Sequence, residues 1–218
     1  MRFKLIDLGL VDFKEAWQFQ KEIFVSVMSG CFESVLVVCR HYPVITLGRL
    51  GNRENILLSE EELKRELSGF YRIERAGDVT YHGPGQITIY PVFNLRYLKK
   101  DIHLFLRYLE EVVICFLSDF GIKALRKIGL TGVWIEDKKI SSIGISIKNW
   151  ITFHGVSVNI KQNDLVNFDY IRPCGMDIKM TSLETVLGRE VDINIIKSNL
   201  INRFADILKM KYAASFLK

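Results

Sequence analysis

Hydrophobic residues recur along the first third of the chain with two different periods, which separate expected helices from expected strands. Apolar residues at three- and four-residue spacings over 13–27 predict an amphipathic helix. The run 34–49, SVLVVCRHYPVITLGR, predicts a buried strand, a turn and a second short strand. Ser59 followed by Glu62 is a capping-box pattern that begins a short helix, and 70–75, FYRIER, returns to strand.

Expected helices and strands also follow one another along the rest of the chain. The longest expected helix covers 101–120, with Gly121 as its stop. The alternation ITIYP predicts a strand directly after a glycine-rich segment, and GVWIEDKKISSIGISI predicts a hairpin that turns at Glu136 to Lys138. The other expected elements are a strand at 150–160 and helices at 181–187 and 194–209.

Strands and helices intermix through all 218 residues, without repeats or low-complexity linkers. This pattern predicts an α/β (α+β) fold in which a mixed β-sheet is flanked by helices. With 49% hydrophobic and 25% charged residues, we expect a single catalytic domain over 1–218, with the C-terminal helices of about 190–218 as a packed appendage.

Composition excludes several classes of protein. The four cysteines show no CxxC spacing and the four histidines no HxH or HxxxH spacing, so we expect reduced thiols and no metal. Apolar runs are strand-length and the first residues lack a signal-peptide pattern, which predicts a cytoplasmic protein without membrane spans. The net charge of +5 favours acidic partners, but the basic residues are scattered without an aromatic stripe, so nucleic acid is not expected.

The segment 80–86, TYHGPGQ, has the most unusual local composition of the chain. Gly83 and Gly85 can adopt positive φ and admit a ligand close to the backbone, while Pro84 stiffens the loop between them. His82 and Gln86 add donors and acceptors suited to holding a carbonyl or a developing oxyanion. The alternative is a tight turn with an incidental surface histidine. Neither GxxxxGK[ST] nor GxGxxG occurs, so this is not a nucleotide loop.

A second candidate is Cys174 in IRPCGM, where a proline and a glycine present a thiol from a turn. The alternative is a buried, inert cysteine, which Cys39 and Cys115 fit better. A reactive thiol needs a neighbouring base or cation. His82, His154 and Lys139 are the candidates, although a single lysine at a strand end is ordinarily a solvated charge.

Three segments together, RAGDVTYHGPGQITIYP, KKISSIGISI followed by FHGVSVNI, and RPCGM followed by Thr181-Ser182, resemble the bacterial octanoyltransferases of lipoate biosynthesis. The resemblance extends from about His41 to Ser182. It implies a fold like the catalytic domains of lipoate and biotin protein ligases. It also implies transfer of an octanoyl group from acyl carrier protein to a lysine of lipoyl domains in 2-oxoacid dehydrogenase complexes or of the glycine cleavage H protein, with no cofactor.

The resemblance also assigns roles to residues. Cys174 takes the acyl chain as a thioester, and Lys139 lowers the pKa of that thiol and moves the proton. The implied substrate-binding residues are Arg75, Ala76, Gly77, Asp78, Val79, Thr80, Tyr81, His82, Ser142, Ile143, Gly144, His154, Gly155 and Val156.

The chain departs from the family pattern at two positions. Ala76 stands where the family has the first of two glycines, and it fits only if its φ is negative. Arg40 replaces an acidic residue before His41, which changes the local charge.

Two other functions remain compatible with the pattern. One is an ATP-dependent lipoate or biotin protein ligase on the same fold, against which the PCG turn argues because ligases that form an acyl-adenylate need no cysteine. The other is a non-catalytic protein that binds lipoyl domains or acyl carriers, against which the presence of both Cys174 and Lys139 argues.

Overall fold

The computed structural model describes residues 2–214, and at Cys174, Ala213 and Ala214 it describes the backbone alone. Eleven strands, five α-helices and three 3₁₀ helices (η) follow one another in this part of the chain. Their order is β1 (Arg2–Val11), α1 (Phe13–Met28), β2 (Ser34–His41), β3 (Val44–Leu47), η1 (Arg53–Asn55), α2 (Glu60–Glu66), β4 (Gly69–Arg72), β5 (Val79–His82), β6 (Gln86–Phe93), α3 (Ile102–Ser118), β7 (Leu125–Lys127), β8 (Leu130–Ile135), β9 (Lys138–Lys148), β10 (Ile151–Asn159), η2 (Gln162–Tyr170), η3 (Pro173–Gly175), α4 (Leu183–Leu187), α5 (Ile193–Ile207) and β11 (Lys211–Ala214).

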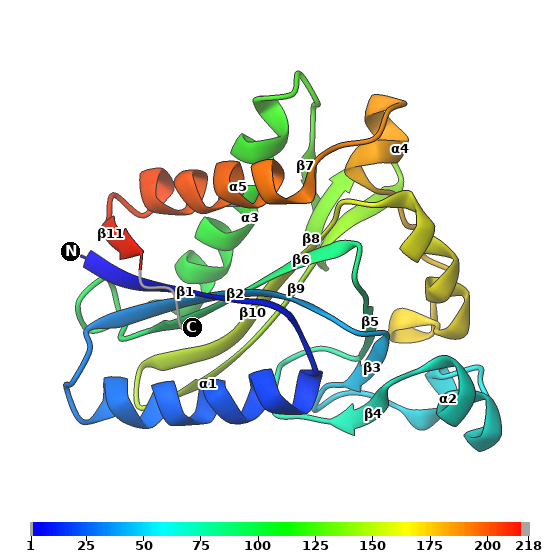
Figure 1. The fold of residues 1–218 in the computed structure, drawn as a ribbon, viewed down its shortest axis with the longest axis horizontal. Coiled ribbons are helices and arrows are strands. Elements are labelled where there is room, and N and C mark those ends of the chain that lie inside the picture. Colours follow the sequence, from blue (N-terminus) through cyan, green and yellow to red (C-terminus); the bar gives the residue numbers. More distant parts are fainter. Residues whose placement is uncertain (1, 215–218) are drawn as a thin grey trace.

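A large mixed sheet forms the centre of the fold, in the order β11-β1-β2-β6-β10-β9-β8-β7. The β1 strand pairs in parallel with β2 and β11, and the other neighbours are antiparallel. Figure 1 shows α1 along one face of this sheet and α3 and α5 along the other. The expected fold class, a mixed sheet flanked by helices, is confirmed.

Side-chain alternation along β2 explains why both faces are covered. Leu36 and Val38 belong to the core under α3 and α5, whereas Val35, Val37 and Cys39 belong to the core under α1. A strand that is buried on both faces reads as a continuous apolar run, which is what the sequence has at 35–39.

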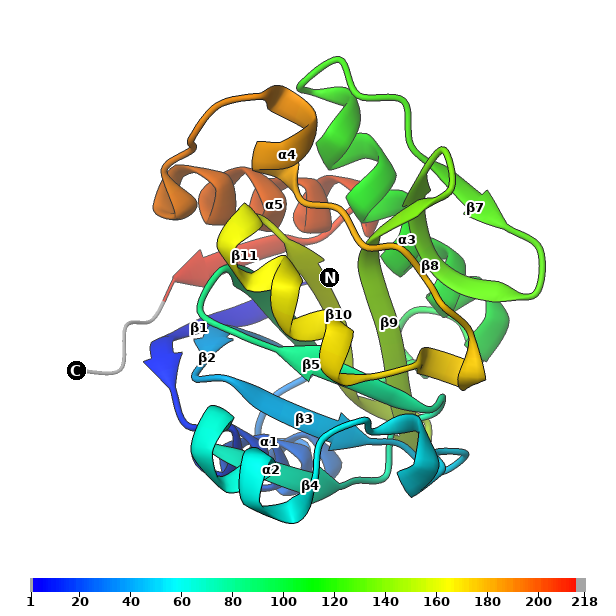
Figure 2. The ribbon, with the colours of Figure 1, turned by 90° about the vertical axis from the view of Figure 1, so that its right-hand side faces the viewer.

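A second sheet, in the order β4-β3-β5, lies at one end of the molecule beside η2 and η3 (Figure 2). Its β5 strand occupies the first part of the glycine-rich segment, which the sequence analysis treated as loop. β5 and β6 are joined through Gly83 to Gly85, so the chain passes from the small sheet into the large one at this turn.

The helix starts follow local side-chain chemistry. The predicted capping box is confirmed, because the Ser59 hydroxyl accepts from the Glu62 amide and the Glu62 carboxylate accepts from the Ser59 amide. Asp101 caps the longest helix by accepting from the Leu104 amide at 2.9 Å. Gly121 follows with a φ of +71° and reverses the chain.

The segment expected as a packed appendage at 190–218 is built into the main fold over its described part. Ile196, Leu200 and Phe204 on α5 are buried in the core that α3 and the large sheet also form. The β11 strand, which the sequence analysis did not predict, pairs with β1 at the sheet edge (Figure 1).

In the part of the chain that the structure describes, the helices are too short or too polar to cross a membrane.

Candidate functional site

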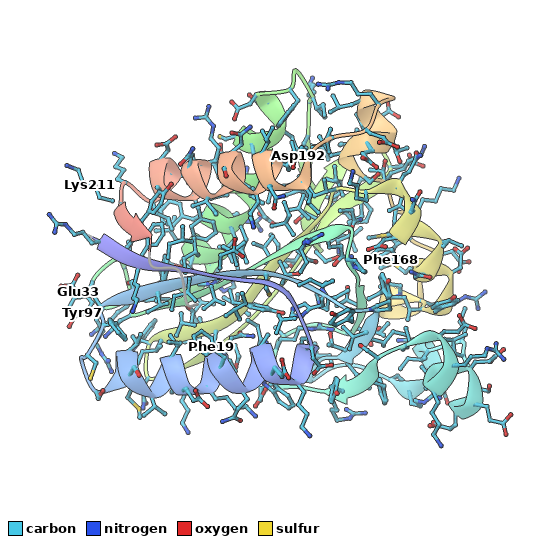
Figure 3. The ribbon with its side chains drawn as sticks, viewed as in Figure 1. Phe19, Glu33, Tyr97, Phe168, Asp192 and Lys211 are labelled. Atoms are coloured by element: carbon cyan, nitrogen blue, oxygen red, sulfur yellow. The ribbon has the colours of Figure 1, made fainter. Side chains whose placement is uncertain are left out.

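A cavity of about 360 Å³ lies between the large sheet, the small sheet and the segment that follows η2. Figure 3 places Phe168 of η2, one of the lining residues, at the end of the molecule opposite Glu33 and Tyr97. Much of the wall is apolar and comes from widely separated elements: Phe13, Leu50, Ile73, Val79, Leu130, Ile143, Val156, Phe168, Met176, Ile178 and Met180. An apolar cavity with a few convergent polar groups is the usual form of a ligand site.

Lys139 lines this cavity near the start of β9 and is half-buried. Its backbone amide donates to the Lys179 carbonyl at 2.8 Å, and its carbonyl accepts from the Thr181 amide at 2.9 Å. These two hydrogen bonds form an isolated parallel β-bridge between Lys139 and Met180. The segment after Cys174 is thereby held against the strand that carries Lys139, although the two residues lie far apart in the sequence.

The Cys174 turn is a short 3₁₀ helix over Pro173–Gly175, and Gly175 adopts a φ of +67°. The Arg172 amide donates to the Asn55 carbonyl at 2.8 Å, which fixes the start of the turn. Pro173 and Met176, on either side of Cys174, line the cavity. The side chain of Cys174 lies outside the described part of the structure, so its predicted role stays a prediction.

Asp78 connects the Cys174 turn to the predicted substrate segment. Its buried carboxylate accepts from the Asn55 side-chain amide at 2.6 Å and from the Asn52 backbone amide at 3.2 Å. Because the Asn55 carbonyl also receives the Arg172 amide, Asn55 is bonded to the substrate segment and to the turn at once.

Arg75 is buried under the small sheet and braces the segment that begins with it. Its guanidinium donates to the Thr46 carbonyl at 2.7 Å and to the Thr46 hydroxyl at 3.1 Å. The neighbouring Ala76 amide donates to the Ile145 carbonyl, which fastens the segment to β9. Ala76 does not have a positive φ, whereas Gly77 does, at +86°, so the condition for alanine at position 76 is met.

Gly132 leaves room for the Lys139 side chain. A Cβ at this position would lie 2.5 Å from Lys139 Cε and 2.5 Å from the Ser141 carbonyl oxygen, and the φ of Gly132 is +131°. The Gly132 amide donates to the buried carboxylate of Glu110 at 3.4 Å. Arg126 forms an ion pair with that carboxylate at 2.9 Å. The backbone at Gly132, next to the Lys139 side chain, is thereby hydrogen-bonded to α3.

Two histidines pack together beside the cavity. The ring of His82 lies parallel to that of Phe13, with centroids 6.2 Å apart, and edge-on to His41, with centroids 5.8 Å apart. His41 bonds Tyr90 Oη at 2.7 Å and the Val11 carbonyl at 3.2 Å. Burial lowers the pKa of His41 to about 4 and the pKa of His82 well below its usual range. Both rings are therefore neutral at pH 7.

We expect His41 to make the folded protein sensitive to acid. The unfolded chain protonates this histidine near pH 6.5, but the folded chain does so only near pH 4, so the unfolded state binds more protons between these values. Stability is then lost as the pH falls, by about 2 kcal/mol from this residue between pH 7 and pH 5. Urea unfolding of the wild type and His41→Gln at both pH values measures the difference.

The variant should be less stable at pH 7 but lose less stability on acidification. His82 and His154, whose pKa values are also lowered by burial, supply the slope that remains. An equal loss in both proteins would show that His41 is not neutral in the fold.

His154 is a buried residue in a strained backbone conformation, with a φ of +58° in the middle of β10. Its amide donates to the buried Gln20 side chain of α1 at 2.9 Å, and its Nε2 lies 3.4 Å from the Glu74 carboxylate. The hydrogen bond with His154 lowers the pKa of Glu74 to about 2. Non-glycine residues keep such a φ only where surrounding contacts hold them, which is common at functional sites.

Comparison with known proteins identifies the family of the chain. The model of the lipoyl protein ligase A/B catalytic domain matches residues 12–205. The chain belongs to this family. An octanoyltransferase of Cytophaga hutchinsonii is 39% identical and covers 94% of the chain and 91% of that relative. An octanoyltransferase of a Thermoanaerobacter species is 40% identical, with 96% and 92% covered.

A solved lipoate-protein ligase A with bound ATP has the same fold, with a TM-score of 0.81 and 16% identity, covering 100% of this chain and 90% of that one. The predicted resemblances to the octanoyltransferases and to the fold of lipoate ligases are therefore confirmed. The chain is an enzyme of the transferase class.

Within this family fold, most of the predicted substrate-binding residues lie around the cavity described above. The residues that line it are Arg75, Ala76, Gly77, Asp78, Val79, Thr80, His82, Ser142, Ile143, Gly144, His154, Gly155 and Val156. Tyr81 does not line it, because its side chain is fully buried in the core cluster of the small sheet and η2. There its hydroxyl accepts from Asn167 at 2.7 Å and its ring packs edge-on against Phe168.

The Gly83-Pro84-Gly85 turn has a different role from the predicted one. It is not part of the cavity wall, and neither glycine has a positive φ. Side chains at Gly83 and Gly85 would collide with Asp164, which accepts from the Gly85 amide at 2.5 Å. The turn is thus a close packing contact with η2. The alternative of a surface histidine is also wrong, because His82 is buried.

The remaining cysteines and Arg40 do not line the cavity. Cys31, Cys39 and Cys115 are free thiols, and burial raises the pKa of Cys39, which makes it inert at neutral pH. Over the described residues, no group of three or more His, Cys, Asp or Glu side chains is arranged to hold a metal ion. Arg40 donates to the Pro84 carbonyl at 3.4 Å and so contacts the glycine-rich turn.

Sequence reasoning missed several residues that line the cavity, above all Phe13, Thr88 and Tyr90. Thr88 and Tyr90 alternate along β6 with residues of the main core. This alternation in the sequence indicated that Thr88 and Tyr90 share one face of the strand, but it did not show that this face lines the cavity. For Phe13, the first residue of a predicted helix, no signal in the sequence pointed to the site.

Proposed function

We propose that this enzyme transfers an octanoyl group from octanoyl-acyl carrier protein to a lysine of lipoyl domains through a thioester on Cys174. The observation that carries the proposal is that Lys139 lines the same largely apolar cavity as Pro173 and Met176, which lie one residue before and two residues after Cys174. An apolar wall suits an acyl chain, and a lysine at its edge is a suitable proton acceptor for a thiol.

In the first half-reaction, the Lys139 amine takes the proton of the Cys174 thiol. The thiolate attacks the carbonyl carbon of the donor thioester, and the carbon–sulfur bond to the carrier breaks. The carrier thiolate leaves with the proton that Lys139 held. One thioester replaces another at nearly equal free energy, so this step requires no ATP.

In the second half-reaction, the lysine amine of the acceptor attacks the same carbonyl carbon. A carbon–nitrogen bond forms, the bond to Cys174 breaks, and the proton lost by the amine restores the thiol. The amide is more stable than the thioester, which drives the transfer forward. The acceptors we propose are lipoyl domains of 2-oxoacid dehydrogenase complexes and the glycine cleavage H protein.

The surroundings of the cavity fit these partners. The residues from Arg75 to Thr80 and the β9 and β10 residues that line the cavity are proposed to hold the substrate. The net charge of +5 favours encounter with acidic carrier proteins. The cytoplasmic location predicted from the sequence belongs to the same proposal, because we expect reduced thiols there.

Nucleotide dependence separates this proposal from a ligase. Purified enzyme is incubated with an apo-lipoyl domain and either octanoyl-acyl carrier protein alone or free octanoate with ATP and Mg²⁺. We expect octanoylated domain only with the carrier-bound donor. Product formed only from octanoate and ATP would contradict the proposal and indicate a ligase, and binding without product would indicate a non-catalytic protein.

Gly132→Ala should slow the transfer because the new methyl group occupies the space of Lys139 Cε. We expect about a tenfold to hundredfold loss of rate from the displaced amine, because misplacing a catalytic group costs this much. Strain at the positive φ should also destabilise the fold by about 1–3 kcal/mol. The rate of transfer and the urea unfolding midpoint are both measured.

Gly188→Ala is the matched control. Gly188 also has a positive φ, of +64°, but an added Cβ would meet nothing within 4 Å. This variant should lose stability and keep its rate. Equal rates in both variants would show that Gly132 does not position Lys139.

A further inference from the structure

A chain of buried amide side chains runs from His82 towards the strand of Lys139. Gln86 and Asn159 face each other across β6 and β10, and both are almost fully buried. The Asn159 Nδ2 donates to the Thr181 carbonyl at 3.0 Å, and the Gln86 Nε2 donates to Asn159 Oδ1 at 3.0 Å. His82 Nδ1 lies 3.2 Å from Gln86 Oε1.

The backbone carbonyls at the two ends of the chain fix the orientation of both amides. A carbonyl only accepts, so Asn159 must direct its NH₂ group to Thr181 and its oxygen to Gln86. Gln86 must then direct its NH₂ group to Asn159, and the same group also reaches the Tyr81 carbonyl at 3.2 Å. The Gln86 oxygen is therefore left for His82, and the reverse orientation would place oxygens against one another.

A hydrogen bond to an amide oxygen requires the proton to lie on His82 Nδ1. In a neutral imidazole the other nitrogen, Nε2, then carries a lone pair. In the described part of the chain, Nδ1 makes the one hydrogen bond assigned to this ring. The ring lines the cavity and is held flat against Phe13.

We propose that Gln86 and Asn159 are positioning residues that hold His82 as the Nδ1–H tautomer, so that its Nε2 accepts a hydrogen bond from the amine that attacks the acyl group. An amine held by this acceptor keeps its own lone pair directed at the carbonyl carbon. The role of Nε2 rests on the proposed transfer reaction, whereas the tautomer rests on the hydrogen bonds alone.

The buried surroundings of His82 oppose a charge on its ring, whereas the hydrogen bond to Gln86 acts in the opposite direction. Burial is the largest cause of its lowered pKa, and the cation of Arg75 acts in the same direction, as protonation of His41 or His154 would. The titratable and charged groups that act on His82 or line the cavity with it come from β2, β6, β9, β10 and the segment before β5. They are His41, Arg75, Asp78, Tyr90, Lys139 and His154.

The ¹⁵N NMR spectrum of uniformly labelled enzyme at pH 7 tests the tautomer directly, with His82 assigned by the loss of its signals in His82→Gln. We expect a protonated Nδ1 and an unprotonated Nε2. A protonated Nε2, in either the other tautomer or the imidazolium, would overturn the proposal. This result does not depend on activity.

Gln86→Glu tests the role of Nε2. The carboxylate still accepts from Nδ1 but stabilises the imidazolium, so Nε2 gains a proton as the pH falls. We expect isolated octanoyl-enzyme of this variant to react with an apo-lipoyl domain about tenfold more slowly at pH 6 than the wild type, with recovery at pH 8. Formation of the octanoyl-enzyme should change less.

The matched control is Gln18→Glu, the same substitution on an exposed residue of α1. It should follow the wild type at both pH values. An active wild type with an unaffected Gln86→Glu variant would overturn the role of Nε2. A wild type that transfers no octanoyl group would instead contradict the proposed function, and the tautomer would still be decided by the NMR spectrum.

Discussion

Replacing Cys174 with serine is expected to abolish the octanoyl-enzyme and to reduce transfer by about 10³-fold or more, the loss typical when a covalent nucleophile is removed. A serine hydroxyl is far less acidic than a thiol, and an amine at Lys139 cannot remove its proton to the same extent. The enzyme is incubated with octanoyl-acyl carrier protein, and its intact mass is recorded before and after hydroxylamine treatment.

Cys31→Ser is the control for this experiment, because Cys31 is an exposed free thiol. This variant should gain one octanoyl group that hydroxylamine removes, as the wild type does. An undiminished hydroxylamine-labile adduct on Cys174→Ser would show that another thiol carries the acyl chain, and the mechanism would be wrong.

Lys139→Ala is expected to slow both half-reactions by about 10²- to 10⁴-fold, the usual contribution of a general acid–base group. Without the amine, the Cys174 thiol loses its proton acceptor and the leaving carrier thiolate loses its proton donor. Burst kinetics of enzyme octanoylation measure the first half-reaction, and chase into an apo-lipoyl domain measures the second.

Lys138→Ala is the matched control, because Lys138 is exposed and precedes Lys139 on the same strand. It should keep both rates. A Lys139→Ala variant with unchanged rates would remove this residue from the mechanism. Equal urea midpoints for the two variants would show that the loss is chemical and does not come from unfolding.

Local chemistry made much of the secondary structure predictable. The capping box at Ser59, the cap at Asp101 and the hairpin turn at Glu136 each depend on residues within a few positions of one another. The buried run of β2 was also clear, because a strand covered on both faces carries successive apolar residues, here Val35 to Cys39.

Elements whose partners are remote in sequence were missed. The β11 strand exists because β1 offers a free edge about 200 residues earlier, and β5 exists because it pairs with β3. Gly83 and Gly85 were assigned to the cavity because the sequence does not show Asp164 packed against them. Such contacts are set by the tertiary structure, which local propensity does not encode.

The candidate site was predictable where a resemblance named its residues and where strand alternation could be counted. Gly132 and Phe13 had neither signal, although one leaves room for Lys139 and the other packs on His82. The strained φ of His154 was also hidden, since it depends on Gln20 of a separate helix.

Chase of the isolated octanoyl-enzyme tests the central claim most directly. Wild-type enzyme is octanoylated with octanoyl-acyl carrier protein, separated from this donor, and mixed with an apo-lipoyl domain in the absence of ATP. The account predicts that the octanoyl group leaves the peptide containing Cys174 and appears on a lysine of the domain as a hydroxylamine-resistant amide, at least as fast as steady-state turnover. An adduct that stays on the enzyme, or that transfers more slowly than turnover, would contradict it.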